Sequence, residues 1–287
     1  MGFGAPGFAT SASGGPIRLL FDSFAQFCHN FTEGNSGSGN GAQSNKPKSE
    51  EQAAKSEKVR DTDSSELEGT FDVGASGMYK DVLKNHRPFS RGPGNPGHKG
   101  VVEADHMPPK DSLKKAAEEP LIWILGESEK FEGLLKMLQK KDPIGRDLFT
   151  LQVLTGQHRT ALTTGNSRES VAVRAVLAHT FATGQVVSAL KQTFLVSHTI
   201  SSMELREQAG IQRDRPEERF GRDRTMRIYR DGFLEMINFF FDREIINFEE
   251  LSELWDYITD HYGVDGDFDR HSDEYDLLIE AIRKSKK

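Results

Sequence analysis

Residues 101–113 read VVEADHMPPKDSL, and this stretch decides the expected architecture. Two β-branched residues open an apolar run that predicts a strand. Pro108 and Pro109 then end the strand, because proline lacks a backbone donor and has a fixed φ. The ionisable pair Asp105 and His106 therefore stands at a strand end, which is a place for chemistry and equally a place for an ordinary turn.

The surrounding sequence predicts a mainly α fold with a small β element, an α+β class. One strand is expected near 100–106 and another near 148–154, in DLFTLQVL. Gly184 interrupts one of the helical stretches, so that stretch forms one or two helices. Helical apolar spacing is found over residues 112–125, 129–141, 167–201, 225–244, 247–263 and 275–287.

The chain is expected to have three parts. Residues 1–75 are rich in Gly, Ser, Lys and Glu, which predicts a disordered, low-complexity segment with one short amphipathic helix, IRLLFDSFAQFCHNF. Residues 76–200 form the predicted central domain. Residues 201–287 form an acidic helical extension, whose helices offer a surface for a protein partner.

Charge and composition limit the function classes. The net charge is -7, and residues 215–287 alone carry 12 Lys and Arg against 19 Asp and Glu, so the rest of the chain is neutral. A nucleic acid would therefore need a local basic surface. The single cysteine, Cys28, excludes an internal disulfide framework and a multi-cysteine zinc site. The candidate basic residues are Lys110, Lys114, Lys115, Lys140, Lys141, Arg146, Arg159, Arg168 and Arg174.

No targeting or membrane segment is expected. The first basic residue is Arg18, and the apolar run beside it is short and broken by Asp22, unlike a signal peptide. No apolar run approaches the length of about 18 residues that a membrane helix requires. We therefore expect no membrane contact and favour an intracellular location, in the cytoplasm or the nucleus.

A hydrolytic centre can be assembled from the Asp-His pair and a second imidazole. A carboxylate or imidazole holds a cation, and a base activates water. Asp105 and His106 supply both groups if the alternation of faces relaxes beyond the strand end. His158 follows an extended run and precedes a Gly-containing loop, which makes it the best second imidazole.

These residues resemble a known superfamily. DHMPPKDSL, followed after a helical segment by HRTALTTGNSRES and a helix, is similar to nuclease-like domains of the HNH/endonuclease VII (ββα-metal) superfamily, in versions found in bacterial polymorphic toxins. The resemblance covers roughly residues 97–192. The long gap from His106 to His158 implies an inserted helix.

The resemblance implies roles for the residues that match its motifs. His106 would be the general base and Asp105 a ligand of a divalent cation, Mg²⁺ first, with Mn²⁺ or Zn²⁺ as alternatives. His158 would be a further ligand, and Arg159 would steady a phosphate oxygen of DNA or RNA. Glu103, two residues before Asp105, would be a spare ligand or support one. The substrate pocket would be shaped by Thr164, Gly165 and Asn166.

A second interpretation assigns no chemistry to these residues. The Asp-His-Pro-Pro element is then a structural turn, His158 and Arg159 serve packing and ion pairing, and the chain is a non-catalytic helical interaction module. His179 lies among apolar helix neighbours and is expected in a core or interface. The acidic run at 265–276 matches an EF-hand loop in part, but lacks its Gly and final Glu, so a solvated turn is expected.

Overall fold

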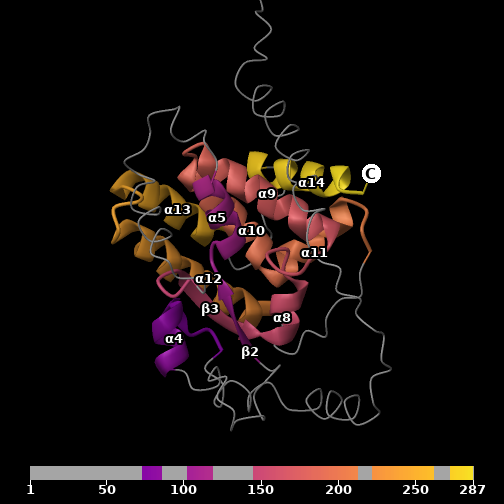
Figure 1. The fold of residues 1–287 in the computed structure, drawn as a ribbon. Coiled ribbons are helices and arrows are strands. Elements are labelled where there is room, and N and C mark those ends of the chain that lie inside the picture. Colours follow the sequence, from indigo (N-terminus) through magenta and orange to yellow (C-terminus); the bar gives the residue numbers. More distant parts are fainter. Residues whose placement is uncertain (1–72, 86–101, 119–144, 213–221, 262–271, 287) are drawn as a thin grey trace, which may run out of the picture. The chain divides into compact units, whose positions relative to one another are not determined.

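The computed structural model (Figure 1) describes five stretches of the chain, all within the unit Ala42–Lys287. They are residues 73–85, 102–118, 145–212, 222–261 and 272–286. Several predictions lie outside the described residues: almost all of the segment 1–75, the helix at 129–141 and most of the acidic run at 265–276. The three-part division of the chain stays a prediction.

The described residues are mainly helical and include one three-stranded sheet, which confirms the predicted fold class. Its strands are β1 (Ser76–Met78), β2 (Val102–His106) and β3 (Phe149–Leu154), in the order β1-β3-β2, and both pairings are antiparallel. β2 and β3 are the two predicted strands. β1 has only three residues, and sequence reasoning did not identify it.

β3 is the central strand, and all six of its residues are buried. A central strand covered on both faces requires a continuous rather than an alternating apolar pattern. Thr150 and Gln152 interrupt the apolar run but are also fully buried. In β2, Asp105 lies opposite Leu151 and His106 lies opposite Thr150, so the pairing with β3 includes His106.

The helix α9 (Arg168–Ala182) is the most buried long helix of the described part and packs against α5 (Lys110–Glu118), α10 (Val186–Ser197) and α14 (Asp273–Lys284). Contacts on several sides explain why its sequence lacks a polar face. The predicted break is present, because Gly184 adopts a φ of 77° between α9 and α10. His179 is buried in α9, in agreement with the expected core position.

A long helix packs on the sheet, and a further helix packs on that helix. α12 (Arg222–Phe241) packs on β1, β3 and α13 (Phe248–His261), and Phe239 and Phe240 near its end are buried. Phe239, for example, contacts Phe149 of β3 edge-on, with ring centroids 5.5 Å apart. No helix within the described ranges is both long and apolar enough to cross a bilayer. The remaining helices are α4 (Tyr79–Asn85), α8 (Thr155–Thr160) and α11 (Thr199–Gln208).

The contact of α12 with β3 is close enough to exclude a methyl group. A Cβ at Gly232 would lie 2.7 Å from one terminal carbon of Leu151 and 2.9 Å from the other. Because Leu151 is fully buried, we expect Gly232→Ala to lower the free energy of unfolding by about 1–3 kcal/mol, measured by urea denaturation. Leu151→Ala removes the obstructing atoms, so the double variant should lose clearly less than the sum of the single losses. Additive losses would show that this contact does not limit the packing.

Candidate active site

The carboxylates of Glu103 and Asp105 share one face of β2. Side chains two residues apart in a strand point to the same side, and the pairing places these two opposite Val153 and Leu151 of β3. Asp105 is 4% exposed, whereas the side chain of Glu103 is 33% exposed. One carboxylate is therefore enclosed by protein, and the other remains accessible to a ligand.

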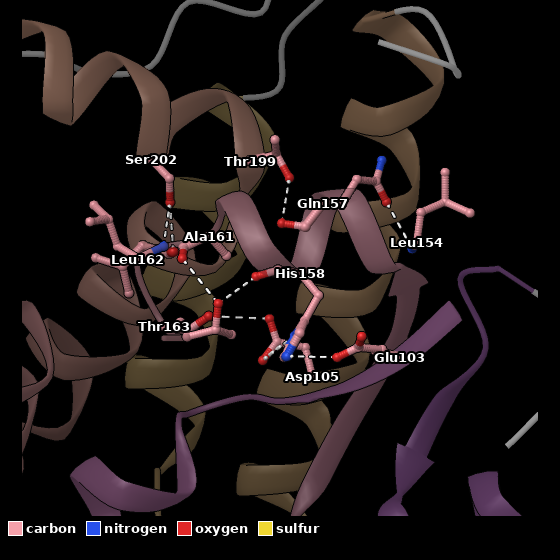
Figure 2. A network of polar contacts seen from close by, with 12 residues as sticks. Glu103, Asp105, Leu154, Gln157, His158, Ala161, Leu162, Thr163, Thr199 and Ser202 are labelled. Carbon is pink, nitrogen blue, oxygen red and sulfur yellow. Dashed lines mark hydrogen bonds and ion pairs between the residues drawn. The ribbon is translucent and has the colours of Figure 1, made fainter. Parts of the chain in front are cut away.

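The short helix α8 brings His158 to these carboxylates. α8 begins directly after β3, and the side chain of Gln157 accepts a hydrogen bond of 3.2 Å from the backbone N–H of Leu154, which closes the turn. The helix packs on both β2 and β3. As Figure 2 shows, the His158 ring points from α8 between the two carboxylates of β2.

The two ring nitrogens of His158 face different partners. Nε2 lies 3.2 Å from Oε2 of Glu103, and Nδ1 lies 3.6 Å from Oδ1 of Asp105. Because these nitrogens are on different edges of the ring, the carboxylates flank the imidazole instead of sharing one of its nitrogens. The buried carboxylate faces Nδ1, and the more exposed carboxylate faces Nε2.

The loop between α8 and α9 fixes both halves of the site. Thr163 donates a hydrogen bond of 3.2 Å from its hydroxyl to Oδ2 of Asp105. Thr164 donates one of 2.6 Å to the backbone carbonyl of His158. Arg174 of α9 in turn donates to the carbonyl of Thr163 at 3.1 Å. The same turn therefore forms hydrogen bonds with the carboxylate of Asp105 and with the backbone of His158.

A fully buried arginine connects this turn to the helical core. Arg206 of α11 donates to the carbonyl of Thr160, at the end of α8, and its Nε lies 3.6 Å from a carboxylate oxygen of Glu169 in α9. Removing one partner of a buried ion pair leaves the other charge buried and uncompensated, which strongly destabilises the fold. Arg206 therefore holds together α8, α9 and α11 behind the site.

The surroundings of His158 change its affinity for a proton. Burial is the largest single influence and lowers the pKa, but the contact with Asp105 and the charges of Asp105 and Glu103 outweigh it. The net result is that the pKa of His158 is raised above its ordinary value of 6.5. The imidazole consequently holds its proton to a higher pH than a free histidine does.

The structure does not bring His106 into this group. Since His106 pairs with Thr150 inside the ladder, strand alternation still applies and directs its side chain to the opposite face from Asp105. There it stacks on Tyr79, with ring centroids 4.7 Å apart, close to Gly145. The expectation that alternation would relax at the strand end is wrong, because the strand ends after His106 and not before it.

The other predicted residues surround the group. Arg159 is largely exposed and places a guanidinium nitrogen 3.9 Å from Oε1 of Glu103. Thr164 binds backbone, while Gly165 and Asn166 are exposed in the loop. Sequence reasoning did not select Thr163 or Arg206. The cluster of hydroxyls in TALTT was a signal for the former, but nothing in the sequence marked Arg206.

The donor set limits how a metal ion could bind. In the described part of the chain, no three side chains of His, Cys, Asp or Glu are grouped to hold a metal ion. This agrees with the flanked geometry, in which Asp105 and Glu103 lie on different edges of the imidazole. Glu103 still offers a partly exposed carboxylate, the ligand type that Mg²⁺ and Mn²⁺ prefer.

No protein-family model matches the chain, and comparison with curated proteins and with solved structures gives no significant match. The chemistry of the site therefore has to be derived from its own geometry.

The raised pKa of His158 predicts how stability depends on pH. A group whose pKa is higher in the folded than in the unfolded state stabilises fully below the unfolded value and stops doing so as the pH rises through the folded value. In chelator-containing buffer, the free energy of unfolding of the wild type should therefore fall relative to His158→Gln from about pH 6.5 upward. His179 serves as the control. Burial lowers its pKa, so its contribution to the free energy of unfolding is present above the ordinary pKa of 6.5 and is lost as the pH falls below that value. A wild-type minus His158→Gln difference that does not change with pH would contradict the assignment.

Loss of the buried arginine should be costly. Arg206→Met leaves Glu169 as a buried carboxylate without its guanidinium partner, so we expect the free energy of unfolding to fall by about 3–5 kcal/mol in urea titrations. The double variant Arg206→Met/Glu169→Gln removes both charges and should recover part of that loss. If the single and double variants unfold at the same denaturant concentration, the pair is not coupled.

Proposed function

We propose that this chain hydrolyses phosphodiester bonds as a metal-dependent nuclease, at the group formed by Glu103, Asp105 and His158. The observation that supports this is the order of the three side chains. A buried carboxylate faces Nδ1 of the imidazole, and a half-exposed carboxylate lies beyond Nε2. Such an order leaves one defined nitrogen to act on a ligand.

Asp105 would act by orienting His158. For Nε2 to carry the lone pair, the proton has to stay on Nδ1, which faces the buried Asp105 at 3.6 Å. Glu103, whose Oε2 lies 3.2 Å from Nε2, would have to turn away from the ring toward its own ligand. Thr163 fixes the carboxylate of Asp105, so neither Asp105 nor His158 has to rearrange during the reaction. A raised pKa also increases the driving force for proton uptake by the imidazole once it is unprotonated.

The proposed reaction is attack of water on the phosphodiester phosphorus. The water oxygen forms the new P–O bond, its proton passes to Nε2 of His158, and one ester P–O bond breaks. The departing oxygen takes a proton from solvent. Of the two histidines considered from the sequence, His158 has the orienting carboxylate, so the proposal assigns it the role that the superfamily resemblance would give to His106.

The charge of the site supports a role for a cation. A phosphodiester is an anion, and it would approach two carboxylates. When His158 is neutral and acts as the base, Arg159 offsets only one of these two negative charges within the group. Glu103 would hold Mg²⁺ or Mn²⁺, since Mg²⁺ is often bound by one or two carboxylates together with substrate phosphates. When bound, the cation would offset the charge of the phosphate oxygens. Arg159 would contact a second phosphate oxygen beside the exposed loop at Gly165 and Asn166.

A second function, a protein-interaction module, is favoured by a different observation. The large apolar side chains that are exposed in the described residues gather at the end of α12 and on α13. A partner bound at this surface would be compatible with catalysis at the central site.

The decisive experiment compares two histidines that differ in their placement. With Mg²⁺ or Mn²⁺ and either plasmid DNA or RNA, we expect His158→Gln to reduce the cleavage rate by about 100- to 10,000-fold, the usual contribution of a general base. Asp105→Asn and Glu103→Gln should also impair cleavage. His106→Gln is the matched control and should retain activity, because its ring lies on the opposite face of β2.

The pH dependence gives a second criterion. Below the raised pKa of His158 the base is protonated, so cleavage should accelerate with pH and level off above that pKa. The proposal is wrong if His106→Gln abolishes cleavage while His158→Gln retains it. It is equally wrong if the pure wild-type protein leaves both nucleic acids intact with each metal.

A further inference from the structure

The exposed side of α13 carries an unusual combination of side chains. Phe248 is 73% exposed and Trp255 is 41% exposed, and they stand seven residues apart, which places them on the same side of the helix. Leu254 and Ile258 form the buried side and pack into the core. Phe241, at the end of α12, is the third large apolar side chain exposed within the described residues.

Acidic residues accompany these aromatic side chains. From Phe248 to His261 the helix has no Lys or Arg, and Glu253 pairs with Lys191 of α10 at 2.6 Å. The acids of α13 are Glu249, Glu250, Glu253, Asp256 and Asp260.

The acids at the two ends of α13 have different consequences for the helix. Glu250 makes a reciprocal cap with Asn247, through hydrogen bonds of 2.9 and 3.0 Å, and negative charge is favourable at a helix N-terminus. Asp256 and Asp260 lie in the second half, and Asp260 stands in the last turn, where the helix dipole disfavours negative charge. Both are exposed, so folding of the helix does not explain them.

We propose that the face of α13 around Phe248 and Trp255 binds a basic amphipathic segment of a partner protein. The apolar side of that segment would cover the two aromatic side chains, and its Lys and Arg would pair with the acids beside them. Charge selects this occupant. A second copy docked through the same face would place two acidic helices against each other, and nucleic acids or anionic membranes would be repelled.

Trp255 provides a direct signal for the test. In full-length protein carrying Trp123→Phe, it is the only remaining tryptophan. The probe is a helical 16-residue peptide with Leu on one side and Lys on the other, and the control peptide has Glu in place of every Lys. We expect saturable binding of the Lys peptide with a blue shift of the tryptophan emission, weakened by salt, and no binding of the Glu peptide.

Two pairs of variants locate the binding surface. Measured by calorimetry, Phe248→Ser/Trp255→Ser should weaken binding at least about tenfold. Asp256→Asn/Asp260→Asn should also weaken binding and reduce its salt dependence, while raising the thermal stability of the protein. Glu207→Gln/Asp276→Asn, which neutralises exposed acids of α11 and α14, is the matched control and should bind like the wild type.

Three results would overturn the proposal. They are absence of saturable binding up to peptide concentrations on the order of 100 µM, equal binding of the Glu peptide, and equal losses in the control pair and the α13 pairs. The stability measurement is independent of the peptide: if Asp256→Asn/Asp260→Asn lowers the melting temperature, the two aspartates serve the helix itself. His158→Gln should leave peptide binding unchanged, so this result does not depend on whether the central site is catalytic.

Discussion

The register of β2 on β3 determines which side chains meet in the candidate active site. Strand alternation has a period of two, so a slip of one residue would turn Glu103 and Asp105 away from α8 and present their neighbours instead. The ladder continues to His106 and stops at the two prolines, which cannot extend it. The same hydrogen bonds that complete the sheet therefore separate Asp105 from His106, although the two are adjacent in sequence. They also bring Asp105 to His158, which is 53 residues further along the chain.

The second constraint is that buried polar groups need partners. Asp105 is enclosed by protein, and an ionised carboxylate in such a place is tolerated only with hydrogen-bond donors and positive charge nearby. Thr163 donates a hydrogen bond to it, Nδ1 of His158 lies 3.6 Å away as an ion-pair partner when protonated, and Arg174 and Arg206 donate to the turn beside both. These contacts leave the imidazole little freedom to rotate. The contacts that partner the buried carboxylate of Asp105 therefore also position the ring of His158. Packing and hydrogen bonds of this kind are how a scaffold holds a reactive group in place.

Sequence reasoning identified the elements that have strong periodicity and missed those without it. The apolar spacing of α12 and α13 and the two β-rich runs were sufficient to predict helices and strands. α8 has six residues and β1 has three, which is too short for any period to be visible. Glu103, Asp105, His158 and Arg159 were all selected, but their arrangement around the ring was not, because it depends on the exact last residue of a strand. Arg206 could not have been found, since its role depends on the packing of three helices that are distant in sequence.

The uneven distribution of charge along the chain would allow the two proposed surfaces to bind ligands of opposite charge. The excess of acids lies entirely in residues 215–287, so the residues that form the central group belong to a part of the sequence that is neutral overall. A polyanion would be repelled by α13, whereas Arg159 and the proposed cation would attract it locally at Glu103. A basic segment would be attracted by the acids of α13 and repelled by the proposed cation and Arg159 near Glu103. Since exposed charges are screened over about 8–10 Å at physiological salt, each ligand responds mainly to the charges at its own surface. The acids of α13 are therefore understandable as a recognition feature that need not weaken phosphate binding at the central site.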